Sequence, residues 1–288
     1  MDAAEREGGG QGMRQSRATK IISRIVIVLF LIIAIFPIYW MINTSFKSQG
    51  EIYYKVPTMI PKHFTLEGYG HLLTKTNFLI SLRNSLIVSL SVCVFSILVA
   101  YPTAYSIARI HFRGRRTFSK VVLFTYLLPT SVLYIPLYIF VANAGLTNSI
   151  WGLVLIYPTF TLPYVAWILI PHIAAVPADL EDAASVDGCS RFGIMYRIVF
   201  PLALPGIIST TIFAFAMCWG EYLYALVNVT SSDVQTFPLV LSGLIFGDMP
   251  PWNELMAGAI IACVPIIIIY FIASSSIIGG ATDGGVKG

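Results

Sequence analysis

Few side chains in this sequence combine the type and spacing that catalysis requires. Glu221 is the only acidic residue well inside a long apolar run. The four histidines, His63, His71, His111 and His172, fall between such runs or at their ends. An acid, a base and a nucleophile must lie within hydrogen-bonding distance of one another to share a proton. Because these acidic and histidine side chains are scattered, the sequence does not favour an enzyme that works inside an apolar environment.

Motifs for metal and nucleotide chemistry are also missing from the sequence. The four cysteines are far apart, and Cys93, Cys218 and Cys263 lie inside apolar runs. There is no CxxC pair and no His/Cys cluster, so we expect neither a metal site nor a structural disulfide. The sequence has no Gly-Lys dipeptide, and therefore no P-loop to hold the phosphates of ATP. We expect no cofactor on this chain.

The most informative polar segment is residues 176–201. Asp179 suits a helix N-cap, and Gly188 can end that helix in the left-handed conformation. Ser190 can cap a second helix, which we expect to stop at Pro201 because proline cannot donate a backbone hydrogen bond. The pattern predicts two short helices joined at a glycine bend.

One face of the first predicted helix carries Leu180, Ala183, Ala184 and Asp187, which are spaced i, i+3, i+4 and i+7. Small side chains on such a face let the backbone of another protein approach closely. An exposed short helix of this kind is typical of helices that dock into a groove on a partner. We therefore expect this segment to bind another protein.

The chain around this segment has the composition of a protein that lies in lipid. Hydrophobic residues make up 57% of it and charged residues 11%, about half the charged share of an average soluble domain. The apolar residues come in blocks of about twenty, the length of a helix that crosses roughly 30 Å of hydrocarbon. Helices are the default spanning element because each satisfies its own backbone hydrogen bonds. The expected fold class is all-α, a polytopic membrane protein.

Six apolar runs predict six transmembrane helices. They are residues 21–42, 84–108, 121–141, 150–171, 205–227 and 256–278. Residues 1–20 are polar and glycine-rich, which predicts a disordered tail. The remaining residues, 21–288, form one predicted membrane domain. Its longer polar segments are 43–83, 172–204 and 228–255.

Lysine and arginine orient this domain. Residues 109–120 hold five of them and the tail holds four, whereas residues 228–255 hold none. Residues 43–83 also hold five, spread over a length that weakens their effect. Because basic loops stay in the cytoplasm, we expect both termini and residues 172–204 to be cytoplasmic. No basic stripe alternates with aromatic residues, so we expect no nucleic-acid partner.

Residues 176–201 resemble the coupling loop of permease subunits of binding-protein-dependent ABC importers. The family pattern is Glu-Ala-Ala, three residues, Gly, nine residues and Ile-x-Leu-Pro. The matching positions keep every spacing, with aspartate for glutamate and phenylalanine for leucine: Asp182-Ala183-Ala184, Gly188 and Ile198-Val199-Phe200-Pro201. The resemblance implies the type I ABC importer permease fold. The ATPase-coupling residues it implies are Asp179, Glu181, Asp182, Ala183, Ala184, Gly188, Arg191, Ile198 and Pro201.

Further segments resemble carbohydrate permeases of the MalG type, among them residues 64–69, 219–223 and 252–256. This resemblance implies a bacterial inner-membrane protein that imports a sugar, a polyol or a glycerol phosphate. It also implies a second, MalF-like permease subunit, two ATPase subunits that bind the ATP, and an extracytoplasmic solute-binding protein. Residues 228–255 would then dock that binding protein through Asp248 and Trp252.

Two questions stay open at the level of sequence. Glu221 is expected either to line the translocation pathway beside Trp219 or to snorkel towards the external interface. The alternative functions are an ion-coupled secondary transporter, a channel, or an ABC permease for a solute other than a sugar. Ion-coupled carriers usually carry several buried acids or unwound segments within their spans, and this sequence shows neither clearly.

Overall fold

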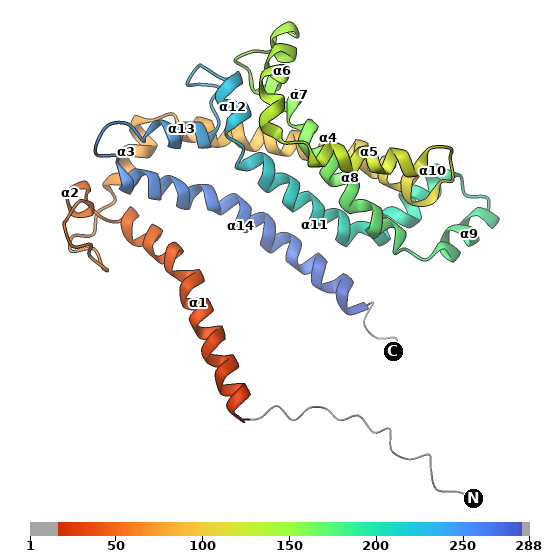
Figure 1. The fold of residues 1–288 in the computed structure, drawn as a ribbon, viewed down its shortest axis with the longest axis horizontal. Helices are drawn as coiled ribbons and strands as arrows, with labels where there is room; N and C mark the ends of the chain where they lie inside the picture. The colour runs from red at the N-terminus through yellow and green to blue at the C-terminus, as the bar shows by residue number, and fades with distance from the viewer. Residues whose placement is uncertain (1–16, 284–288) are drawn as a thin grey trace, which may run out of the picture.

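The computed structural model describes the backbone of residues 17–283 and the side chains of residues 21–273, and all regular elements in this part are helices. The predicted all-α class is confirmed. The long helices are α1 (Arg17–Ser45), α4 (Phe78–Arg109), α8 (Pro158–Ala174), α11 (Phe200–Trp219) and α14 (Trp252–Asp283). In Figure 1, α4, α8, α11 and α14 run side by side, and α1 diverges from them.

Within the described residues, five helices are long and apolar enough to cross a membrane, or six if one bent pair counts as a span. The first of them, α1, begins at Arg17, four residues before the predicted boundary of the tail. The other residues of the predicted disordered tail, 1–16, lie outside the described residues.

The predicted third span, residues 121–141, falls on this bent pair. α5 (Arg115–Leu127) and α6 (Thr130–Asn143) meet at an angle of 93°, so the prediction of one helix over residues 121–141 is wrong. Leu128 between them is extended, with φ −65° and ψ 131°. Pro129 follows it, and the ring of a proline disfavours helical backbone at the preceding residue. The local sequence at Leu128 and Pro129 therefore accounts for the break between α5 and α6.

The predicted fifth span, 205–227, is also wrong at both ends. The helix starts at α10 (Arg191–Gly193), continues through the π-helix η1 (Ile194–Val199) into α11, and ends at Trp219. A separate helix, α12 (Leu223–Asn228), follows the break. Pro201 does not end a helix, because it lies in the first turn of α11 directly after the wider π-turn, where Phe200 donates its N–H to Met195.

The spans pack through buried side chains and small residues. Tyr101, Leu169 and Phe215 are fully or almost fully buried between α4, α8 and α11. The hydroxyls of Ser96 and Thr161 share a hydrogen bond of 2.8 Å between α4 and α8, a polar contact typical of helices packed in lipid.

Several of the short helices lie at the two ends of this bundle. α2 (Gln49–Ile52), α3 (Glu67–Lys75) and α13 (Phe237–Gly243) lie at one end in Figure 1. α9 (Ala178–Val186) and α10 lie at the opposite end. α7 (Ile150–Ile156) leads into α8, and Tyr157 between them precedes a proline that cannot donate a backbone bond. The segment of most interest, α9 with α10, is thus held at one end of the spans.

Candidate coupling site

α9 begins two residues earlier than the sequence predicts. Its N-cap is Pro177, which makes no side-chain cap, and Asp179 lies in the first turn. The prediction that Asp179 caps the helix is therefore wrong. Its carboxylate still lies near the positive end of the helix dipole, where acidic residues are favourable.

The bend after α9 follows the sequence prediction. Gly188 has a positive φ of 81°, and the N–H of Cys189 bonds back to the carbonyl of Ala184 at 2.9 Å. A Cβ at Gly188 would meet nothing within 4 Å, so the backbone conformation alone requires glycine. Ser190 caps the next helix by accepting from the N–H of Gly193 at 3.2 Å. Both predictions are confirmed.

The two sides of α9 have different surroundings. Glu181 and Ala184 are half-buried, and Ala184 packs against the core of the chain itself. Asp182 and Ala183 are exposed, as is Leu180 at 44%. Only part of the predicted docking face is therefore open to a partner, because Ala184 is turned inward.

Glu181 anchors α9 to the membrane spans. Its carboxylate pairs with the guanidinium of Arg109 at 2.6 Å and accepts from the hydroxyl of Tyr105 at 2.9 Å. Arg109 also donates to the carbonyls of Ile173, at 3.0 Å, and of Val176. One carboxylate thus ties α9 to the ends of α4 and α8.

Sequence reasoning missed Tyr105 and Arg109 as members of this site. Arg109 was counted only among the basic residues that orient the membrane domain. The available signal was its position at the end of a span, where a buried guanidinium requires a carboxylate partner.

The end of α9 and the segment after it expose apolar side chains. Val186 is 87% exposed and Phe192 is 74% exposed. A groove of about 540 Å³ lies beside them, lined by residues from Gly188 to Arg197. Among the predicted coupling residues of this stretch, Arg191 and Pro201 are exposed and Ile198 is half-buried. The arrangement is an anchored helix with an apolar tip, which suits mechanical contact with another protein.

Trp219 and Glu221 have structural partners within the chain. Trp219 is buried, and its indole N–H donates to the carbonyl of Ala262 at 3.0 Å. Glu221 lies in the break before α12 and accepts from the N–H of Tyr224 at 2.8 Å and from the hydroxyl of Tyr157 at 2.8 Å. Its carboxylate therefore caps α12, a role that neither sequence interpretation contained.

At the opposite end of the bundle, two segments distant in sequence are joined. Gln49 and Tyr53 both donate to the carbonyl of Pro250, at 3.0 and 2.9 Å. The loop that they hold exposes Asp248, and Trp252, 36% exposed, begins α14 directly after it.

Near this junction, Glu51 is buried and accepts from the hydroxyl of Thr58 at 2.6 Å and from the N–H of Lys62 at 2.9 Å. These bonds, led by that of Thr58, hold the pKa of the Glu51 carboxyl below its ordinary value. The carboxylate thereby fixes the fold of the segment between α1 and α3.

Comparison with known proteins identifies the family. The family model of the binding-protein-dependent transport system inner membrane component matches residues 93–278. The chain belongs to this family. The match includes α9, the glycine bend and all of α11, so the resemblance noted in the coupling segment extends over most of the membrane domain.

Relatives in this family match the chain over nearly its whole length. The diacetylchitobiose uptake system permease protein DasC of Streptomyces coelicolor is 34% identical over 278 residues, which are 96% of this chain and 100% of that protein. The trehalose/maltose transport system permease protein MalG of Thermococcus litoralis is 31% identical, covering 96% and 100%.

A solved structure has the same fold. The crystal structure of a bacterial ABC transporter involved in the import of the acidic polysaccharide alginate has a chain that superposes with a TM-score of 0.78. The two chains are 20% identical over 91% of this chain and 97% of that one. The ABC importer permease fold is thus confirmed.

Family and fold together establish this chain as a multi-pass membrane permease subunit of an ABC importer. The prediction of a transporter subunit rather than an enzyme is confirmed, because the family consists of membrane components of transport systems.

Proposed function

We propose that this permease imports a carbohydrate and that α9 with the following bend couples it to separate ATPase subunits. DasC is named for diacetylchitobiose uptake and MalG for trehalose/maltose transport, which supports an oligosaccharide or a related polyol as the solute. The observation that carries the coupling role is the Glu181–Arg109 pair, with its O–N distance of 2.6 Å.

A coupling element must be fixed to the membrane spans on one side and exposed to the ATPase subunits on the other. Glu181 and Ala184 face the chain itself, and Asp182, Ala183 and Val186 face outward. Through Arg109, a displacement of α9 passes to α4 and α8. Through η1, which continues directly into α11, the same displacement passes to a third span. ATP is bound by the ATPase subunits in this scheme.

The opposite end of the bundle docks the solute-binding protein. The loop before α14 exposes Ile245 at 55%, Phe246 at 88% and Met249 at 58%, next to Asp248. Its fastening by Gln49 and Tyr53 gives this apolar tip a defined position. Basic residues 109–120 support the opposite, α9-bearing end as cytoplasmic, with both termini on that side.

A second permease subunit completes the pathway. α1 leaves its own bundle, as Figure 1 shows, and none of its most apolar stretch is buried within the chain. Such a helix is available to pack on a second, similar subunit while lipid covers its other side.

Cross-linking tests the coupling role. Val186→Cys in the assembled importer should form a disulfide or a short bis-maleimide cross-link with the ATPase subunit, and the yield should change when ATP is added. Phe246→Cys at the other end is the matched control, and it should cross-link to the solute-binding protein. Cross-linking of Val186→Cys to the solute-binding protein instead would reverse the proposed orientation.

A further inference from the structure

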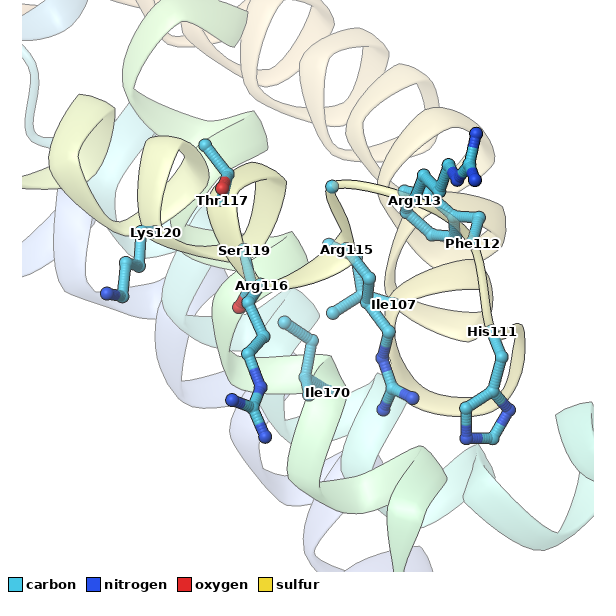
Figure 2. Close-up of a pocket in the computed structure, with 11 residues that line it drawn as sticks. Ile107, His111, Phe112, Arg113, Arg115, Arg116, Thr117, Ser119, Lys120 and Ile170 are labelled. Carbon is cyan, nitrogen blue, oxygen red and sulfur yellow. The ribbon is translucent and has the colours of Figure 1, made fainter.

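A basic groove of about 1040 Å³ lies between the start of α5 and the ends of α4 and α8. Its lining comes from the end of α4, the loop that contains His111 and Arg113, the first turns of α5 and Ile170 of α8. The α5 residues are cations and hydroxyls: Arg115, Arg116, Thr117, Ser119 and Lys120. In Figure 2 the side chains of Arg115, Arg116 and Lys120 point to the same side, with Ile170 between the two arginines, and Arg113 points away. Three cations therefore line one side of a groove that also has apolar walls.

The charge of this groove has no acidic counterpart in the described part of the chain. None of the residues that line it is a carboxylate, and the first turn of α5 contains none. The nearby Arg109 is already paired with Glu181. The N-terminus of a helix carries a partial positive charge of its own, so Arg115 and Arg116 add like charge at the point where α5 favours an anion.

Arg115 is held in position by the fold. Its guanidinium donates to the carbonyl of Ala108 at the end of α4, at 3.1 Å. Gly114, with a φ of 87°, provides the turn that brings α5 back against α8. The groove is therefore a defined feature of the packing between α4, α5 and α8.

α5 continues from this charged turn into an exposed apolar stripe. Phe118, Val121, Phe124 and Leu127 recur every third residue and are 44%, 54%, 66% and 65% exposed. A ligand with a negative headgroup and acyl chains matches both halves of this helix. The groove also lies at the end of the bundle where α9 leaves the spans (Figure 1), which the proposed orientation puts at the level of the cytoplasmic lipid headgroups.

We propose that this groove binds the phosphate headgroup of an anionic phospholipid, with the acyl chains lying along α5. The headgroup neutralises the start of α5 and holds it against α8, beside the Arg109 anchor of α9. Basic pockets at the interface between spans are known to select anionic lipids by their charge. Each cation removed should weaken lipid binding about fivefold.

Native mass spectrometry of the purified importer in mild detergent tests this proposal. The probe is palmitoyl-oleoyl phosphatidylglycerol, with palmitoyl-oleoyl phosphatidylcholine and inorganic phosphate as comparison arms. Arg116→Gln should retain about fivefold less phosphatidylglycerol than the wild type, and Arg116→Gln with Lys120→Gln about 25-fold less. Arg116→Lys should bind like the wild type, and Arg113→Gln, which removes the cation that points away, should change retention less than twofold.

Three results would overturn the proposal. Equal retention of phosphatidylglycerol by all variants would mean that the groove selects no anionic lipid. Displacement of the lipid by millimolar inorganic phosphate would make it a site for free phosphate. Loss of the ATPase subunits from the double variant, with lipid retention unchanged, would make it a protein-docking surface. The readout is lipid retention, so it does not depend on which solute is imported.

Discussion

Glu181→Gln should release α9 from the membrane spans without changing its shape. The variant removes the carboxylate from the Arg109 pair and leaves a guanidinium that is only 18% exposed without a counter-charge. Breaking a fully buried pair costs about 3–5 kcal/mol, and a surface pair about 0–1 kcal/mol. With the two side chains 18% and 13% exposed, the cost lies between these limits, at about 2 kcal/mol.

This cost should appear as local opening of α9. A destabilisation of about 2 kcal/mol raises the population of the open state about 30-fold. In hydrogen–deuterium exchange on the purified importer, the amides of α9 should therefore exchange about 30-fold faster in the variant. Tyr105→Phe should add less to Glu181→Gln than it costs alone, because both changes affect the same carboxylate.

Asp182→Asn is the matched control for this experiment. It makes the same change from carboxylate to amide one residue later, on the exposed side of α9, and should alter exchange less than twofold. If Glu181→Gln and Asp182→Asn had equal effects, Glu181 would not anchor α9, and the route of coupling through Arg109 would be refuted.

Three further predictions concern a bend, a cap and a buried carboxylate. Gly188→Val should lower uptake about tenfold with membrane insertion unchanged, because a side chain at a positive φ is strained by roughly 1–2 kcal/mol. Gly50→Val is the control, since a Cβ there also meets open space. Equal uptake by the two variants would contradict a role for the Gly188 bend in coupling. Glu221→Gln should lower the Tm of the purified protein, since a charged cap contributes about 1.5–3 kcal/mol, and an unchanged Tm would contradict the capping role. The pKa of Glu51 is lowered in the folded protein, so its contribution to stability is complete above pH 4.5 and is lost as the pH falls through the folded-state pKa. Glu51→Gln should therefore be less stable than the wild type at pH 7, and the difference in stability should close in acid. A difference in stability that grows in acid would contradict the lowered pKa.

The coupling segment could be predicted where its signals are local. Gly188 and Ser190 act on backbone groups within five residues of themselves, so their types and spacing were sufficient. Asp179 was assigned to the wrong position because the N-cap is Pro177, so the helix starts two residues earlier. Helix boundaries are set by competition between neighbouring capping residues, and such competition shifts an end by a residue or two.

The broken spans show a different limit. The break before Pro129 follows from a local rule, but hydropathy alone treats residues 121–141 as one span. Glu221 was assigned to water or to the pathway because it stands in an apolar run. Its actual partners include Tyr157, which lies between α7 and α8, and no local pattern predicts that contact. Arg109 and Glu181 likewise meet only because the end of α4 lies beside the first turn of α9.

In the proposed scheme this permease works only with separate ATPase subunits. The most direct test of this scheme is solute uptake by proteoliposomes that contain either the complete importer with its solute-binding protein or this chain alone. The solute panel would include diacetylchitobiose, trehalose and maltose. The complete importer should accumulate at least one of these when ATP is supplied, and this chain alone should accumulate none under a proton or sodium gradient. Gradient-driven uptake by the chain alone would contradict the account and identify an ion-coupled carrier.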